Sequence, residues 1–105
     1  IAVMTGHATA AGLLLAMSCD YRIIYNNNNS YYFIPAVKLG LYYTEGMIEL
    51  IKGKVNNNVS RDMLCYSKRY KGIDDINNAG LVDYIIKYNN DIDNNAIDII
   101  INELI

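Results

Sequence analysis

The segment Gly6–Gly12, with the sequence GHATAAG, carries the clearest chemical signal in this chain. It lies between a β-branched apolar run and a run rich in Ala, Leu and Met, so it should form the turn between a strand and a helix. The first backbone N–H groups of a helix have no intrahelical acceptor, and the helix dipole adds partial positive charge there. Such a turn can hold an oxygen that becomes negative during a reaction. The alternative is that its small residues serve only tight packing of helix on sheet.

Few side chains near this turn could move a proton. His7 is the only histidine, and no Ser, Cys or carboxylate stands in a triad-like arrangement with it, which favours a structural role. Glu45 could act as a base, although a glutamate at a helix start is also stabilised by the dipole alone. Cys19 and Cys65 form no CxxC pair, which is typical of a reducing compartment. No metal site is predicted.

The elements that position this turn alternate between strand and helix. Ile1–Thr5 and Asp20–Tyr25 are rich in β-branched or aromatic residues and are predicted to be buried strands. Ala10–Ser18 between them is apolar on all faces and is predicted to be a buried helix. Strand, helix and strand form a βαβ unit. Because the early strands are apolar on both faces, we expect more chain, or a partner, to cover them.

The rest of the chain is predicted to be mostly helical, which makes the fold class α/β. An extended piece is predicted at Tyr31–Ile34, a loop at Leu39–Leu41 and a strand at Leu81–Ile86; helices are predicted at Gly46–Ile51, from a Ser60 cap to about Tyr66, from an Asp74 cap to Gly80, and at Asp91–Ile105. The asparagine runs between them, Asn56–Asn58 among them, are interpreted as loops. No boundary between domains is predicted, only a sheet part over residues 1–43 and a mainly helical part over 44–105.

Composition excludes two classes of function. The net charge is −2 and no run of Lys or Arg is present, which argues against binding to nucleic acid. The apolar stretch Ala10–Met17 is far shorter than the roughly 20 residues that cross a bilayer, so no membrane span is predicted.

Several motifs occur together in an order that resembles one family. Gly6–Gly12, Asp20–Tyr21, Lys38–Leu41 and Gly80–Asp83 match a GHAxAAG segment, an Asp-Tyr strand, an xLGL loop and a GLVD ending. This order resembles the C-terminal half of the crotonase (enoyl-CoA hydratase/isomerase) superfamily, and within it the eukaryotic Δ3,Δ2-enoyl-CoA isomerases. The resemblance covers Ile1 to about Ile86. It implies part of a spiral of ββα turns, followed by C-terminal helices, that binds acyl-CoA.

The resemblance also implies how the site works. In the family, two backbone N–H groups polarise the thioester carbonyl and stabilise an enolate. The N–H of Ala11 matches the second donor, whereas the first lies on an earlier loop that this chain does not contain. The substrate-binding residues implied in the same way are Gly6, His7, Ala8, Gly12, Ala36 and Leu41. Coenzyme A enters as part of the substrate, and no separate cofactor is implied.

Both glutamates that the family commonly uses are absent. The isomerase position holds Ala36 and the hydratase position holds Leu14. Glu45 lies close to where related dienoyl-CoA isomerases place an aspartate, so it is the candidate substitute base. Two hypotheses stay open. The chain acts as an enoyl-CoA isomerase or hydratase on fatty acyl-CoA, or it is a catalytically inactive acyl-CoA-binding or structural relative, or a truncated fragment.

The resemblance extends to assembly and location. Members of the family commonly form trimers through C-terminal helices. A homo-trimer is compatible with an apolar stripe in Asp91–Ile105 made of Ile92, Ala96, Ile99, Ile100 and Leu104. The isomerase branch is often peroxisomal, but this chain ends in Glu-Leu-Ile rather than Ser-Lys-Leu. Location therefore stays open between peroxisome, mitochondrion and cytosol.

Overall fold

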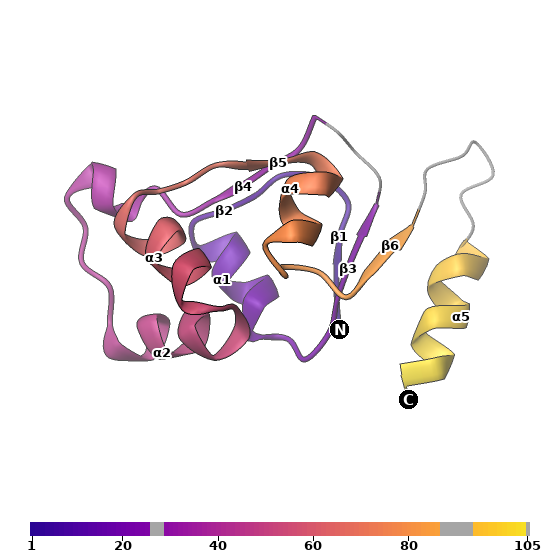
Figure 1. Ribbon diagram of the computed structural model, residues 1–105. Coiled ribbons are helices and arrows are strands. Elements are labelled where there is room, and N and C mark those ends of the chain that lie inside the picture. The colour runs from indigo at the N-terminus through magenta and orange to yellow at the C-terminus, as the bar shows by residue number, and fades with distance from the viewer. Residues whose placement is uncertain (26–28, 87–93, 105) are drawn as a thin grey trace.

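The computed structural model describes residues 1–25, 29–86 and 94–104, and for residues 94–97 it describes the helix but not the side chains (Figure 1). The elements are β1 (Ala2–Met4), β2 (Ala8–Thr9), α1 (Ala11–Ser18), β3 (Arg22–Tyr25), β4 (Tyr31–Phe33), the 3-10 helix η1 (Ala36–Leu39), α2 (Glu45–Lys54), α3 (Asn57–Cys65), β5 (Tyr70–Lys71), α4 (Gly72–Asn78), β6 (Tyr84–Ile86) and α5 (Asn94–Leu104). None of these helices is long and apolar enough to cross a membrane.

The first sheet has the strand order β1-β3-β6, and both pairings in it are parallel. Ala2 pairs with Arg22 and Ile23 pairs with Tyr84, so β3 is the central strand. Helix α1 connects the parallel strands β1 and β3, which confirms the predicted βαβ unit. The last strand begins at Tyr84 rather than at Leu81, because Leu81 is buried in the core before the chain reaches the sheet.

The second sheet has the order β2-β4-β5, of which only β4 was predicted. β2 and β5 are two residues long, too short to show an alternating pattern. β2 runs parallel to β4, with Ala8 opposite Tyr32, and β5 runs antiparallel to β4, with Tyr70 opposite Tyr32. Tyr32 and Tyr70 are both buried, and burial raises the pKa of each phenol.

The hydrophobic core lies between α1, the two sheets and α2–α4. Its fully buried members include Leu13 and Met17 on α1, Ile24 on β3 and Ile51 on α2. The prediction that α1 is buried on all sides is wrong at Leu15, whose side chain is 71% exposed. No described element covers that face of the helix.

Two predicted helix caps are corrected. Asn56, not Ser60, caps α3, because its side chain accepts a hydrogen bond from Val59 N–H at 2.9 Å. Ser60 is buried inside α3, and its hydroxyl donates to the Asn57 carbonyl. Because α3 begins at Asn57, part of the Asn56–Asn58 run is helical rather than loop.

The second correction concerns α4. Asp74 lies within its first turn and does not cap it; the neighbouring Asp75 accepts from Lys71 N–H at 3.0 Å instead. Gly80 follows this helix with φ 77°, which confirms the predicted glycine at its end. Within the predicted loop Leu39–Leu41, Leu39 is the last residue of η1. Gly40 follows it and has a φ of 69°.

The C-terminal helix α5 is confirmed in type, and it includes Asn94–Asn95, one of the asparagine runs that composition alone favours as loops. Ile92 lies outside the described residues, and the side chain of Ala96 is not described. Ile99 is 60% exposed, whereas Ile100 and Leu104 are partly buried, so the predicted stripe does not share one degree of burial.

Candidate functional site

The turn Gly6–Gly12 and the loop that contains Ala36 emerge at one edge of the second sheet. β2 and β4 are parallel, so their carboxyl ends meet at the same edge. Ala10 N–H donates to the Phe33 carbonyl at 3.0 Å and joins the two segments just beyond the strands. Figure 1 shows the start of α1, η1 and the start of α2 at this end of the molecule.

Ala10 holds the helix start in an unusual backbone conformation. Its φ is 51° and its ψ is −126°, a region that residues with a Cβ rarely adopt. The Leu14 N–H donates to the Ala10 carbonyl at 3.1 Å and makes the first turn of α1. Within the described residues no group accepts a hydrogen bond from the N–H of Ala11, and both Ala11 and Gly12 are exposed. A strained turn therefore presents free donors to the outside.

Replacing Ala10 with glycine should stabilise the chain. Glycine removes the strain at this φ but gains freedom in the unfolded state, so we expect a net gain of about 1 kcal/mol, or about 5 °C in Tm. Ala8→Gly is the matched control, because Ala8 lies in β2 and the same change there should lower Tm. A thermal melt of each variant measures the effect, and two equal losses would contradict the assignment of strain to Ala10.

The two positions that the family resemblance matches to glutamates hold apolar side chains in the structure. Ala36 and Leu14 are both partly buried and pack against the core. Neither can exchange a proton. Glu45 is the first residue of α2 and is exposed, next to Thr44, whose hydroxyl caps the helix by accepting from Met47 N–H at 3.2 Å. Glu45 therefore lies at the same end of the molecule as the start of α1. No contact among the described residues shows that it acts as a base.

His7 is held by β4. Its Nδ1 accepts a hydrogen bond from Tyr31 N–H at 2.8 Å, and its ring stacks on the Tyr31 ring at 5.8 Å between centroids. These contacts support the structural interpretation of His7.

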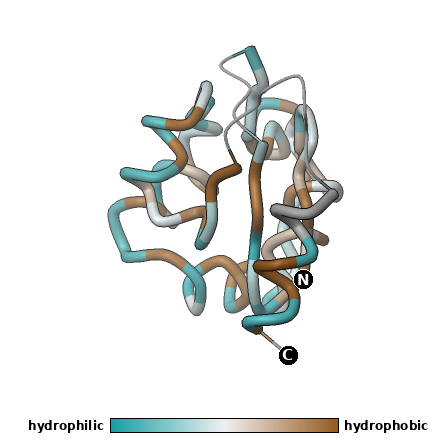
Figure 2. Tube along the Cα trace, turned by 90° about the vertical axis from the view of Figure 1, so that its right-hand side faces the viewer, coloured by the Kyte–Doolittle hydropathy of each residue, from teal (hydrophilic) through white to brown (hydrophobic). Residues whose placement is uncertain are grey.

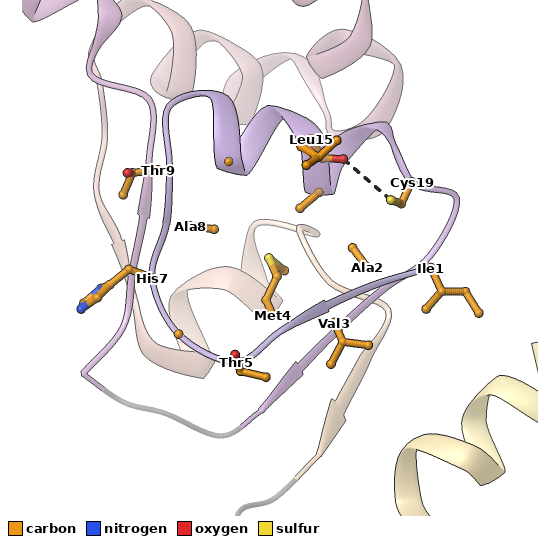
Figure 3. Close-up of a pocket in the computed structure, with 13 residues that line it drawn as sticks. Ile1, Ala2, Val3, Met4, Thr5, His7, Ala8, Thr9, Leu15 and Cys19 are labelled. Atoms are coloured by element: carbon orange, nitrogen blue, oxygen red, sulfur yellow. Dashed lines mark hydrogen bonds between the residues drawn. The ribbon is translucent and has the colours of Figure 1, made fainter. Parts of the chain in front are cut away.

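A hollow of about 690 Å³ lies between β1, β2 and α1. It gathers four of the predicted substrate-binding residues: Gly6, His7, Ala8 and Gly12. In Figure 3, Ala8, Met4 and Leu15 surround it, while the His7 ring points away. Ala11, Ala36, Leu41 and Glu45 do not line it, and Leu41 is 60% exposed on the loop after η1. The predicted residues therefore divide between this hollow and positions outside it.

Sequence reasoning missed two positioning groups. The carbonyl of Phe33, which holds Ala10, is a backbone group and leaves no signal in residue type. Thr44 was detectable, since a Thr immediately before a glutamate and an apolar run is a usual helix start. Among the described residues no group of three or more His, Cys, Asp or Glu could hold a metal ion.

Comparison with known proteins agrees with this architecture. The solved structure of an enoyl-CoA hydratase/isomerase family protein from Hyphomonas neptunium superposes with a TM-score of 0.78 at 21% identity, over 94% of this chain and 36% of that one. A family member from Pseudomonas syringae gives 0.70 at 23% identity, over 78% and 35%. These likenesses confirm the partial crotonase-like fold.

Sequence comparison reaches the same family. Enoyl-CoA delta isomerase 2, peroxisomal, from Arabidopsis thaliana is 31% identical over 84 residues, which are 79% of this chain and 34% of that protein. Enoyl-CoA delta isomerase 3 from the same plant is 32% identical over 69% of this chain and 30% of its own length. The chain spans about a third of the length of these relatives. The family model described as enoyl-CoA hydratase/isomerase matches residues 1–104, so the chain belongs to the enoyl-CoA hydratase/isomerase family.

Proposed function

We propose that this chain binds a fatty enoyl-CoA thioester and places its carbonyl oxygen at the N–H of Ala11. The observation that carries the proposal is the start of α1, where Ala10 is strained, Ala11 N–H has no acceptor among the described residues, and both are exposed. Small side chains around it admit a carbonyl to the backbone. Family membership supplies the substrate class, and the named activity of the Arabidopsis relatives is isomerisation of enoyl-CoA.

The chemical effect of this donor is to stabilise an enolate. Removing an α-proton from a thioester moves negative charge onto the carbonyl oxygen, and a fixed N–H there lowers the energy of that state. One such donor contributes roughly 3 to 4 kcal/mol to a transition state. The dipole of α1 acts in the same direction. In the family, as the resemblance implies, a second donor acts beside this one.

A non-catalytic binding protein is the second candidate. The observation that favours it is that Ala36 and Leu14 occupy the two glutamate positions and pack against the core. Under the enzyme hypothesis, Glu45 is the carboxylate proposed to replace them. Under the binding hypothesis, the turn holds the thioester without moving a proton. The two hypotheses share the contact at Ala11 and differ only in turnover.

The Ala11→Pro variant tests the shared contact. Proline removes the N–H and suits the first position of a helix, whereas Ala11→Ser keeps the N–H and is the matched control. We expect Ala11→Pro to weaken binding of an acyl-CoA at least about tenfold and Ala11→Ser to leave it unchanged. Calorimetric titration measures the affinity, and a thermal melt verifies folding.

An isotope label gives a second readout that needs no substitution. A ¹³C-labelled thioester carbonyl should have a lower stretching frequency when it is bound to the wild-type chain than when it is free in solution, because a hydrogen bond to the oxygen polarises the C=O. Equal affinity of both variants together with an unshifted carbonyl band would overturn the proposal.

Assembly and location follow as coarser proposals. Two of the Arabidopsis isomerases are named peroxisomal, which makes the peroxisome the location we propose first. The homo-trimer implied by the family resemblance stays a prediction.

A further inference from the structure

A groove of about 430 Å³ lies between helices α2 and α3. Only Val55 and Asn56 join the two helices, so the end of α2 lies beside the start of α3 (Figure 1). The groove shares no lining residue with the hollow beside β1, and neither Ala11 nor Ala36 lines it. It is therefore a candidate site separate from the one described above.

The walls of the groove are apolar. Ile48 lies on α2 and Leu64 on α3, and both belong to the hydrophobic core or pack against it. Tyr43 precedes α2, and its hydroxyl donates to the Leu64 carbonyl at 3.0 Å, so this hydroxyl already has its acceptor. Figure 2 shows hydrophobic and hydrophilic residues alternating in short stretches along the chain, as helices with one apolar face require. These walls suit an aliphatic chain.

Two of the polar side chains that line the groove have partners within the chain. The Ser60 hydroxyl donates to the Asn57 carbonyl at 3.1 Å. The Arg61 guanidinium forms an ion pair with the Asp62 carboxylate at 3.0 Å, so together they add no net charge. Lys52 also lines the groove and is exposed, and no carboxylate among the described residues forms an ion pair with it. The groove therefore offers one unpaired positive charge.

The unpaired charge lies toward one end of the groove. Lys52 is in the last turn of α2, one turn beyond Ile48, and Asn57, which also lines the groove, begins α3. Leu64 and Cys65 lie toward the other end, at the end of α3. From Asn57 to Leu64 the helix rises roughly 10 Å, about the length of an extended chain of eight carbons. The groove is thus positive toward one end and apolar toward the other.

We propose that the α2–α3 groove binds a medium-chain fatty acid anion, with its carboxylate at the Lys52 ammonium and its alkyl chain along Ile48 and Leu64. One unpaired ammonium balances one negative charge, which favours a carboxylate over a phosphate dianion. Burial of the alkyl chain supplies most of the affinity, and the charge fixes the orientation of the ligand. The ligand is a free acid and not a thioester, so the site does not depend on the proposed contact at Ala11.

The two cysteines report where the ligand binds. Cys65 is exposed and lines the groove, whereas Cys19 lines the hollow beside β1. Octanoate below its micelle concentration should slow alkylation of Cys65 by a maleimide about tenfold at ten times its Kd, because the bound chain covers the thiol. The rate at Cys19 should not change. Mass spectrometry of the digested chain measures both rates. Unchanged alkylation of Cys65, or equal protection of both thiols, would overturn the proposal.

The role of the charge is tested separately. Lys52→Gln removes the charge and should weaken binding of octanoate about fivefold, while binding of octanol, which has the same chain and no charge, stays the same. Lys71→Gln is the matched control, because Lys71 is an exposed lysine on β5 outside the groove. Calorimetric titration measures each Kd. Unchanged octanoate binding in Lys52→Gln, or an equal loss in both variants or for both ligands, contradicts the assignment of the carboxylate to Lys52.

Discussion

Arg22→Met is expected to lower the free energy of unfolding by about 3 kcal/mol. Arg22 is 4% exposed, yet its guanidinium is charged, and every interaction that compensates for burial comes from the backbone or from one carboxylate. Its Nε donates to the Leu81 carbonyl at 2.7 Å, and one terminal nitrogen donates to the Cys19 carbonyl at 2.9 Å. The other lies 3.9 Å from the Asp83 carboxylate.

The size of this effect follows from what the substitution leaves behind. Methionine fills much of the same volume but donates nothing, so the Leu81 carbonyl loses its buried donor. The Cys19 carbonyl keeps Lys54, which donates to it at 3.1 Å. Asp83 keeps its hydrogen bond from Arg22 N–H at 2.8 Å, because that donor belongs to the backbone. The loss of stability therefore comes from the segment at Leu81, which connects α4 to β6 in the first sheet.

Arg69→Met is the matched control for that prediction. Arg69 is exposed, and its guanidinium lies 4.5 Å from the centre of the Phe33 ring. Such an exposed contact contributes less than about 1 kcal/mol. Thermal or urea unfolding of both variants should show a fall in Tm of more than about 10 °C for Arg22→Met and only a few degrees for Arg69→Met. Similar losses would show that Arg22 does not hold the sheet together.

The sequence predicts the first sheet well and the second sheet poorly, for a physical reason. β1 and β3 are bounded by residues that commonly end a strand, and they consist mostly of residues that favour strands. β2 and β5 are formed by register with β4 and not by their own composition, so they exist only in the assembled fold. The predicted cap of α3 differs from the observed one for a similar reason. Asn56 and Ser60 can both cap a helix, and burial of Ser60 decides between them.

The candidate site divides in the same way. The position of Ala11 at a helix start follows from the motif that surrounds it. The conformation of Ala10 does not, because alanine gives no sign of a positive φ. The hollow beside β1 is formed by segments that the sequence places only in order, and its lining could not be predicted without their arrangement in space. Residue type thus predicted the helix start at Ala11, and tertiary structure determined what surrounds it.

Ala36→Glu is expected to raise isomerisation of a 3-enoyl-CoA about 100-fold over the parent protein. The family resemblance matches this position to the glutamate of the isomerases. The Ala10–Phe33 hydrogen bond ties its loop to the helix start that carries Ala11. A carboxylate there can take a proton from the α-carbon and return it to the γ-carbon, while the N–H of Ala11 stabilises the enolate in between. The gain depends on both groups, so adding Ala11→Pro to Ala36→Glu should remove most of it.

Two controls separate this gain from a change in binding. The glutamine of Ala36→Gln is as long as glutamate and is also polar, but it transfers no proton. The activity of Ala36→Gln should therefore equal that of the parent protein. Glu45→Gln in the Ala36→Glu background should leave the new activity intact, since the carboxylate introduced at position 36 then carries the proton and the exposed glutamate at the start of α2 is not needed. The rate of formation of the conjugated 2-enoyl-CoA, followed by its ultraviolet absorbance, measures each variant. Equal rates for the glutamate and glutamine variants would show that position 36 does not face the reacting carbons.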